Sequence, residues 1–202
     1  MRNNLMLSRR GFGAGFAASA VALALPRAAL ALTVDDARTL VGRTIDGVNG
    51  IINSGKSEPA MLGDFEKLFA RYADVPVIAR SALGVAAKSA SKAQLAAFTK
   101  AFRGYISRKY GRRFREFIGG RIEVTAAKPL KSYFEVVSVA YLPGDAPFDV
   151  RWHVSDKSGK DLFFNIIIEG VNMLASERTE IGALLDKRNG NLDQLIADLK
   201  SL

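Results

Sequence analysis

The stretch from Ser91 to Ile118 constrains the fold most, because it has the pattern of one long amphipathic helix. Its apolar residues recur every three or four positions, which places them on one side of a helix with about 3.6 residues per turn. Ser91 and Gln94 form a capping box at its start, and Gly119-Gly120 predicts its end. The apolar stripe consists of Leu95, Phe98, Phe102, Ile106, Tyr110, Phe114 and Phe117. Other elements or a ligand must cover it.

The rest of the sequence predicts helices before and after a group of strands along the chain. Apolar residues have helical spacing at both ends of the chain and alternate with a period of two after Gly120. The expected helices cover residues 33–52, 61–72, 76–83, 172–188 and 192–199, and the expected strands cover 121–125, 133–142, 148–155 and 162–168. This order indicates an α+β fold, in which helices pack on one face of a curved antiparallel sheet of about four strands.

Composition fits one globular domain of ordinary type. The chain has 202 residues, of which 49% are hydrophobic, and a formal charge of +9. Four arginines and no acids fall in residues 1–31, so residues 32–202 carry 25 basic and 20 acidic residues, a net charge of +5. This excess is modest. The absence of cysteine excludes disulfides and removes any evidence on redox compartment.

The N-terminus predicts export. Ser8-Arg9-Arg10-Gly11-Phe12 precedes an apolar run too short to span a bilayer, and Ala29-Leu30-Ala31 is a typical cleavage site. Residues 1–31 are therefore predicted to be a cleavable signal peptide of the twin-arginine type, and residues 32–202 the mature domain. An uncleaved N-terminal anchor is the alternative.

No catalytic constellation is visible. His153 is the one histidine and no cysteine could share a metal with it, so a surface histidine is the expected interpretation. Glu169-Gly170 more often ends a strand and turns the chain than it forms a site. Nucleophile-elbow, phosphate-loop and dinucleotide-binding motifs are absent from the sequence. The chain is predicted to be neither an enzyme nor a metal or cofactor protein.

A basic cluster on the long helix allows two interpretations. Arg108, Arg112 and Arg115 are expected to project into solvent opposite the apolar stripe. They would form an ordinary solvated face, or they would attract anionic lipid head groups or an acidic partner. Helical geometry and export both argue against nucleic acid. The whole cluster is Arg103, Arg108, Lys109, Arg112, Arg113 and Arg115.

The abundance of aromatic residues is also open to two interpretations. The long helix and the strands supply many of them, and they would fill an ordinary core. The same residues would line a cavity between a curved sheet and a helical layer, because ligand pockets are mostly apolar. Composition alone does not decide between these.

An ordered series of short motifs resembles the MlaC/toluene-tolerance family of periplasmic phospholipid-binding proteins. The first runs from Phe69-Ala70-Arg71-Tyr72-Ala73-Asp74-Val75 through Ile78-Ala79-Arg80 to Leu83-Gly84. The series continues with Gln94, Phe98, Phe102, Tyr110-Gly111, Phe148-Asp149-Val150-Arg151-Trp152 and Ile168-Glu169-Gly170-Val171-Asn172-Met173. Asp161, Asn165 and Asn172 depart from the family pattern, which leaves the lipid open and makes a hopanoid-associated, HpnM-like branch an alternative.

The resemblance implies a lipid carrier with a cone-shaped fold like those of nuclear-transport-factor and cystatin proteins. Such a monomeric carrier would shuttle phospholipid in the periplasm between an outer-membrane lipoprotein complex and an inner-membrane ABC transporter complex, with the acyl chains held between sheet and helices. The implied lipid-binding residues are Phe98, Phe102, Ile106, Tyr110, Val150, Trp152, Phe164, Ile166, Ile168 and Val171. As a hypothesis, Val171→Glu would block loading. The alternatives are an envelope adaptor with a filled core, or an enzyme with a polar pocket around His153 or Glu169.

Overall fold

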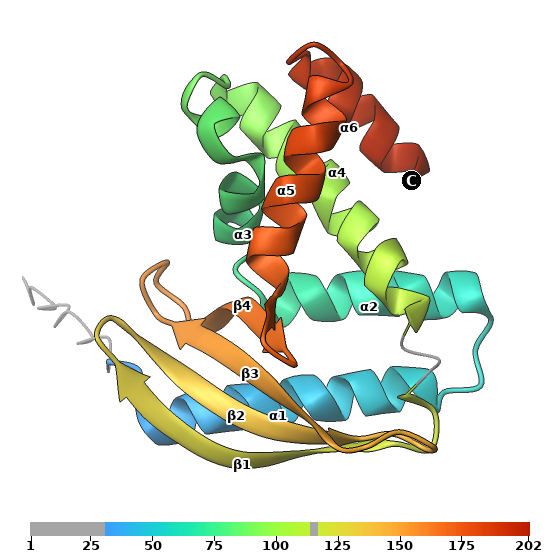
Figure 1. The fold of residues 1–202 in the computed structure, drawn as a ribbon, viewed down its shortest axis with the longest axis vertical. Coiled ribbons are helices and arrows are strands. Elements are labelled where there is room, and N and C mark those ends of the chain that lie inside the picture. Colours follow the sequence, from blue (N-terminus) through green and yellow to red (C-terminus); the bar gives the residue numbers. More distant parts are fainter. Residues whose placement is uncertain (1–30, 114–116) are drawn as a thin grey trace, which may run out of the picture. The chain divides into compact units, whose positions relative to one another are not determined.

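A five-stranded antiparallel sheet and a group of helices make up the computed structural model, which describes residues 31–113 and 117–202 (Figure 1). The helices are α1 (Val34–Ile52), α2 (Glu58–Tyr72), α3 (Val75–Leu83), α4 (Lys92–Gly111), α5 (Met173–Asp186) and α6 (Leu192–Ser201), and the 3-10 helix η1 (Gly84–Lys88) follows α3. The strands are β1 (Arg121–Leu130), β2 (Tyr133–Tyr141), β3 (Phe148–Ser155), β4 (Leu162–Ile168) and β5 (Val171–Asn172). The predicted α+β class is confirmed. The predicted export signal covers residues 1–31, of which only Ala31 belongs to the described part.

Side-chain caps explain where several helices begin. The Ser91 hydroxyl accepts a hydrogen bond from the Gln94 amide and the Gln94 side chain accepts one from the Ser91 amide, both at 3.1 Å, which confirms the predicted capping box. Thr33 caps α1 in the same reciprocal way with Asp36. Asn172 caps α5 by accepting a hydrogen bond from the Ala175 amide at 3.1 Å. These caps satisfy amide groups that a helix leaves free in its first turn.

Helix α4 ends at Gly111, well before the predicted end at Gly119-Gly120. Gly111 lies close against α2, since a Cβ there would come within 2.5 Å of Leu62 Cδ2. Phe117 packs on a small cluster formed by Val48, Ile52 and Phe65. The prediction was wrong because Phe117, which is partly buried, continues the apolar spacing of the stripe although it lies beyond the end of the helix.

The strands pair in chain order from β1 to β5, and every pair is antiparallel. Strand β1 runs past the predicted end at Thr125 to Leu130, with a register irregularity between Val124 and Ala126. Most of its residues are exposed or half-exposed. The sequence therefore lacks the clear alternation of apolar and polar residues that marks a strand with one buried face. Pro129 is tolerated because β1 is an edge strand. The two-residue β5 is an addition to the four strands expected.

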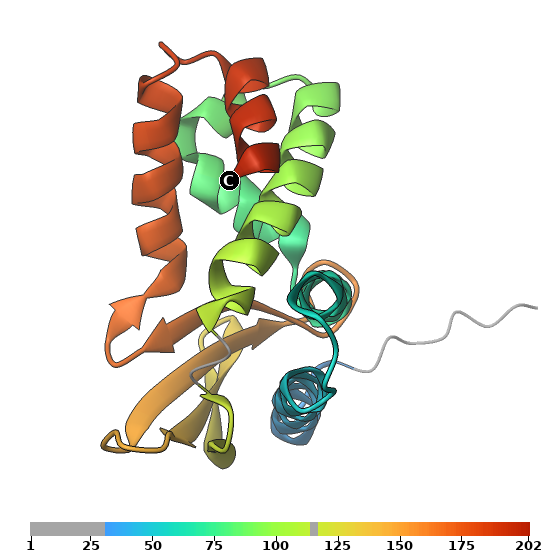
Figure 2. The ribbon, with the colours of Figure 1, turned by 90° about the vertical axis from the view of Figure 1, so that its right-hand side faces the viewer.

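The two faces of the sheet carry different kinds of residue. The inner face carries Val136, Ala140, Val150, Trp152 and Val154, which are all buried. Helix α1 packs on it, and Ala37, Val41 and Ile45 of this helix belong to the same core cluster (Figure 2). The outer face carries Tyr133, Glu135, His153, Asn165 and Ile167, by strand alternation and register.

The remaining helices form their own layer. Helix α4 packs against α2, α3 and α6, and α5 packs against α3 (Figures 1 and 2). Phe98, Phe102, Leu195 and Leu199 are completely inaccessible in the centre of this layer. None of the described helices is both long enough and apolar enough to cross a membrane.

Candidate functional site

Four of the predicted binding residues come together on the inner face. Val150 pairs with Ile168 and Trp152 pairs with Ile166 across β3 and β4. The Trp152 indole nitrogen donates a hydrogen bond to Ser138 Oγ at 3.0 Å, and that hydroxyl donates one to the Val150 carbonyl at 3.1 Å. These bonds fix the indole while its ring keeps an apolar surface. This part of the sheet is therefore a well-ordered apolar wall.

The apolar wall is not covered to the same degree everywhere. Its centre is buried, but residues around it on the same face keep part of their surface exposed. We call them the half-buried row; they are Ile122, Val124, Phe148, Ile166 and Ile168. Their register with Ser138, Ala140, Val150 and Trp152 places all five on the inner face. An apolar surface that its own fold leaves partly uncovered is a candidate ligand site.

The four predicted residues of α4 divide between core and site. The rings of Phe98 and Phe102 stack with centroids 5.7 Å apart, and both are fully buried among helices. Ile106 is 8% exposed, and Tyr110, one turn further along, is half-buried. The stripe thus leads from the centre of the helical layer to a partly accessible end.

Phe164 and Val171 lie apart from the others. The Phe164 ring contacts the rings of Tyr133 and His153, with centroid distances of 5.4 and 5.8 Å, so it lies on the outer face although it also touches the core. A register irregularity near Val154 makes Phe164 the unpaired residue and changes its side. Val171 is 55% exposed on β5.

A polar group, which we call the α4–α5 clamp, joins the end of α4 to the start of α5. Lys109 Nζ lies 2.7 Å from Glu177 Oε1 and 2.5 Å from Glu180 Oε2. The Tyr110 hydroxyl donates to Glu177, and the Tyr105 hydroxyl donates to Glu180. The Glu177 side chain is only 4% exposed, and its Oε2 atom has no hydrogen-bond partner among the described residues. The Glu177 carboxylate, held by one lysine and one tyrosine, thus links α5 to α4, and removal of either partner would leave it less compensated.

The contacts within the α4–α5 clamp shift the pKa values of its side chains. Burial and the hydrogen bonds to glutamates raise the pKa of both Tyr105 and Tyr110, so both hydroxyls stay protonated as donors. Burial opposes the charge on Lys109, but its hydrogen bonds to Glu177 and Glu180 outweigh this effect and raise its pKa. Burial likewise opposes the charge on Glu180, and the hydrogen bonds from Lys109 and Tyr105 still lower its pKa. At neutral pH Lys109 and Glu180 are therefore both charged.

His153 is not the surface residue that was expected. Its side chain is 12% exposed and lies 3.7 Å from Glu135 on the outer face, where Lys128 also reaches Glu135 at 3.1 Å. Burial lowers its pKa, so it is largely neutral at neutral pH. This burial was not predicted, because strand alternation assigns His153 to the polar face of the sheet. On that face the rings of Tyr133 and Phe164 cover it. The described residues hold no group of metal-ligating side chains around it.

Glu169-Gly170 turns the chain between β4 and β5, as expected. Both residues have positive φ, 49° for Glu169 and 81° for Gly170. The Glu169 carboxylate therefore lies in a turn and not in a pocket.

The basic cluster of α4 is mostly engaged within the protein. Arg108 does not project into solvent: it donates to the Leu199 carbonyl at 2.6 Å, and its Nε atom is buried. Arg103 pairs with Glu66 at 2.9 Å, and Arg112 lies 3.8 Å from Glu58. Packing against α2 and α6 surrounds much of α4, so the solvated face expected for an isolated amphipathic helix is narrow. Arg115 lies outside the described residues.

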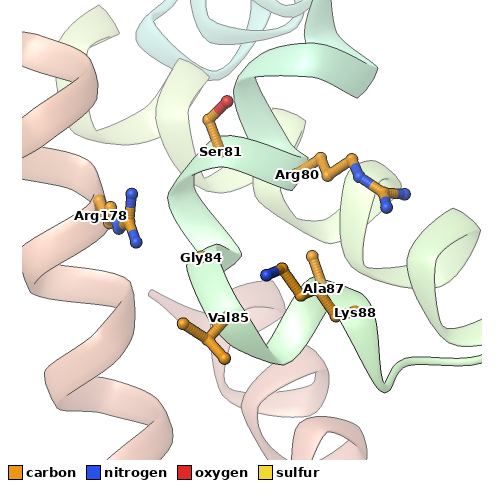
Figure 3. A pocket seen from close by; sticks show the side chains of 7 residues that line it. All are labelled: Arg80, Ser81, Gly84, Val85, Ala87, Lys88 and Arg178. Carbon is orange, nitrogen blue, oxygen red and sulfur yellow. The ribbon is translucent and has the colours of Figure 1, made fainter.

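Two shallow hollows lie on the surface of the described part of the chain. One, of about 370 Å³, is lined by Arg80, Ser81, Gly84, Val85, Ala87, Lys88 and Arg178 (Figure 3). The other, of about 330 Å³, is lined by Ala86, Ser89, Ala90, Gln94, Gly190, Asn191, Leu192 and Asp193. Neither includes the half-buried row, His153 or Glu169.

These elements define an α+β protein with a curved antiparallel sheet whose inner face keeps a partly uncovered apolar surface. The family model described as MlaC protein matches residues 42–201, and the chain belongs to this family. Membership confirms the resemblance found in the motifs and supports the prediction of a non-enzymatic protein. The hopanoid-associated branch stays a prediction.

A solved structure has the same fold. It is that of the phospholipid-binding protein from Ralstonia solanacearum in complex with a phospholipid. The two chains superpose with a TM-score of 0.67 at 18% sequence identity, over 81% of this chain and 98% of that one. At this identity the match establishes the architecture.

Three groups were invisible to sequence reasoning. The α4–α5 clamp joins residues far apart in the chain, and its one local signal is the spacing of Glu177 and Glu180 on a single side of a helix. The outer-face group around His153 depends on strand register. The pocket around Gly84 depends on how α5 packs beside α3.

Proposed function

We propose that this chain is a periplasmic lipid carrier that binds the acyl chains of a phospholipid against the inner face of its sheet. The half-buried row carries this proposal, because it is an apolar surface that the protein's own helices leave partly open. Ile166, Ile168, Val150 and Trp152 form the wall, and Ile106 and Tyr110 approach from α4. Phe98 and Phe102 lie in the filled first half of α4, and Val171 is largely exposed to solvent.

Burial of acyl chains supplies enough free energy without a covalent bond or an ion-binding group. Each methylene transferred from water contributes about 0.8 kcal/mol, so burial of long acyl chains is a large favourable term that offsets the cost of association. Ile106, Val150 and Trp152 are already buried, so acyl chains replace side-chain contacts here and the helices shift to admit them. The polar head group stays toward solvent.

The cellular role extends this proposal. The family relationship and the predicted twin-arginine signal favour a monomer that is exported and shuttles lipid between an outer-membrane lipoprotein complex and an inner-membrane ABC transporter complex. Support for the lipid class comes from the Ralstonia solanacearum protein of the same fold, whose structure holds a phospholipid. A hopanoid-type lipid is the alternative cargo, in keeping with Asp161, Asn165 and Asn172.

One observation favours a second function, that of an envelope adaptor without cargo. Neither of the two hollows described above lies on the inner face, and the centre of that face is well filled. In this case the half-buried row would be plain core margin.

Native mass spectrometry of the exported protein, followed by organic extraction, tests both functions. The carrier predicts a bound mass that releases phospholipid or a hopanoid, and transfer of lipid from vesicles to protein purified without it. Bare protein that also takes up no lipid from vesicles would refute the carrier and leave the adaptor.

A further inference from the structure

A pocket with three positive charges lies where α3 passes into η1, next to α5. Arg80, Lys88 and Arg178 line it, and no acidic side chain does. None of the three takes part in an ion pair among the residues that the structure describes. This contrasts with Arg103, Lys109 and Arg112 on α4, which all have acidic neighbours.

The backbone at Gly84 shapes the pocket. Gly84 has a φ of +63° and a ψ of −130°, a conformation that favours glycine. A Cβ at this position would lie 3.2 Å from Arg178 Nε, so the bare glycine lets the guanidinium lie over the turn. In Figure 3, Arg178 reaches from α5 toward Gly84 and the amino group of Lys88 is turned to the same place, whereas the Arg80 guanidinium points away from Arg178.

Two like charges brought to one hollow without a counter-charge repel each other, and an anion placed between them is attracted by both. The planar guanidinium of Arg178 can bind a carboxylate through two parallel hydrogen bonds. Val85, at the edge of the same hollow, is 72% exposed and offers an apolar contact beside the charges.

We propose that this pocket is the docking site for an acidic segment of a partner protein, which places a carboxylate against Arg178 and Lys88 and an apolar side chain against Val85. A hollow can receive a side chain, whereas a bilayer surface needs a flat or protruding patch. No aromatic residue lines the pocket, and aromatic residues are typical of membrane–water interfaces. Both features favour a protein over a membrane.

The pocket includes part of a stretch that the lipid site does not use. Arg80 and Gly84 belong to the stretch from Ile78 to Gly84 that carries part of the family resemblance. Leu83 in this stretch is buried in the core, but Arg80 is exposed and Gly84 partly so. Docking here goes beyond the carrier function and does not require that the protein hold lipid.

Binding of a short fluorescent peptide of alternating glutamate and leucine, measured by anisotropy, tests the site, with the glutamine version of the peptide as the uncharged control. Arg178→Glu is expected to weaken binding about fivefold or more, because it removes the fork and adds a repulsive charge. Lys131→Glu at the turn between β1 and β2 changes the net charge equally, and should weaken binding less than about twofold. Arg178→Lys should lie between wild type and Arg178→Glu.

Two outcomes would overturn the proposal. Equal weakening by Lys131→Glu and Arg178→Glu would mean that the peptide senses only the overall positive field. Loss of binding to vesicles containing phosphatidylglycerol in Arg178→Glu, with peptide binding unchanged, would make the pocket a membrane contact. Native mass spectrometry of the same variant should find its lipid content unchanged, so failure of the docking site and failure of the carrier are distinguishable.

Discussion

The two halves of α4 carry the same kind of apolar stripe and do different things with it. In the first half, Phe98 and Phe102 are completely buried among helices. In the second half, Ile106 is buried, but Tyr110 keeps part of its surface exposed and donates a hydrogen bond to Glu177 in the α4–α5 clamp. Helical periodicity is the same throughout. The surroundings decide which part of an apolar stripe becomes core and which part remains accessible to a ligand.

This difference teaches that a binding surface can be the continuation of a core. The first half needs no ligand, because aromatic stacking and neighbouring helices satisfy it. In the second half, Ile106 belongs to the same core cluster as Val150 and Trp152 of the apolar wall, and the half-buried row of that wall is not fully covered by the protein itself. Stability should therefore depend mostly on the first half and lipid binding mostly on the second.

The largest effect on stability is expected at the buried half. Phe102→Ala removes a fully buried ring and should lower the free energy of unfolding by about 3–5 kcal/mol, measured by urea denaturation. Phe148→Ala makes the same truncation in the half-buried row and should cost clearly less, because its ring is already partly exposed. Equal losses at the two positions would contradict the contrast between a filled core and a partly open surface.

The largest effect on lipid binding is expected from Ile168→Glu. It places a carboxylate on the inner face among the proposed acyl chains, where an uncompensated charge is strongly unfavourable. We expect at least about a tenfold loss of bound lipid relative to wild type, measured by native mass spectrometry after both proteins have been incubated with lipid vesicles.

Its matched control is Ile167→Glu, one residue earlier and on the outer face, where Arg151 and Asn172 are its strand partners. This variant should retain lipid. Ile168→Trp covers the case in which Ile168→Glu fails to fold, because it adds volume without charge and should also reduce lipid. A folded Ile168→Trp protein with normal lipid content would remove this residue from the site.

Local signals predicted much of the fold. Caps at Thr33 and Ser91, alternation along β3 and the turn at Glu169 each depend on neighbours in sequence, and all were predicted correctly. The early end of α4 at Gly111 was not predicted, because Phe117 continues the apolar spacing beyond it.

The candidate site was less predictable for the same reason. The inner-face positions of Val150 and Trp152 follow from alternation, but an extra residue in β4 moves Phe164 to the outer face. Arg108 has the spacing of a solvated residue, yet α6 covers it. Side chains that depend on register or on helix packing could not be placed from sequence alone.

The smallest effect concerns the pH dependence of the clamp at the end of α4. Because the pKa of Glu180 is lowered in the folded protein, its contribution to stability is present above the ordinary pKa of a glutamate and is lost as the pH falls through the lowered value. Glu180→Gln should therefore lower Tm near neutral pH and should differ less from wild type below about pH 4. Since the Glu180 side chain is 45% exposed, the neutral-pH difference should be only roughly 2 °C and should shrink in high salt. Melting curves of both proteins across this pH range test the sign. A difference that grows on acidification would mean that Glu180 is not held as a charged partner of Lys109, and that the second half of α4 is secured by Glu177 alone.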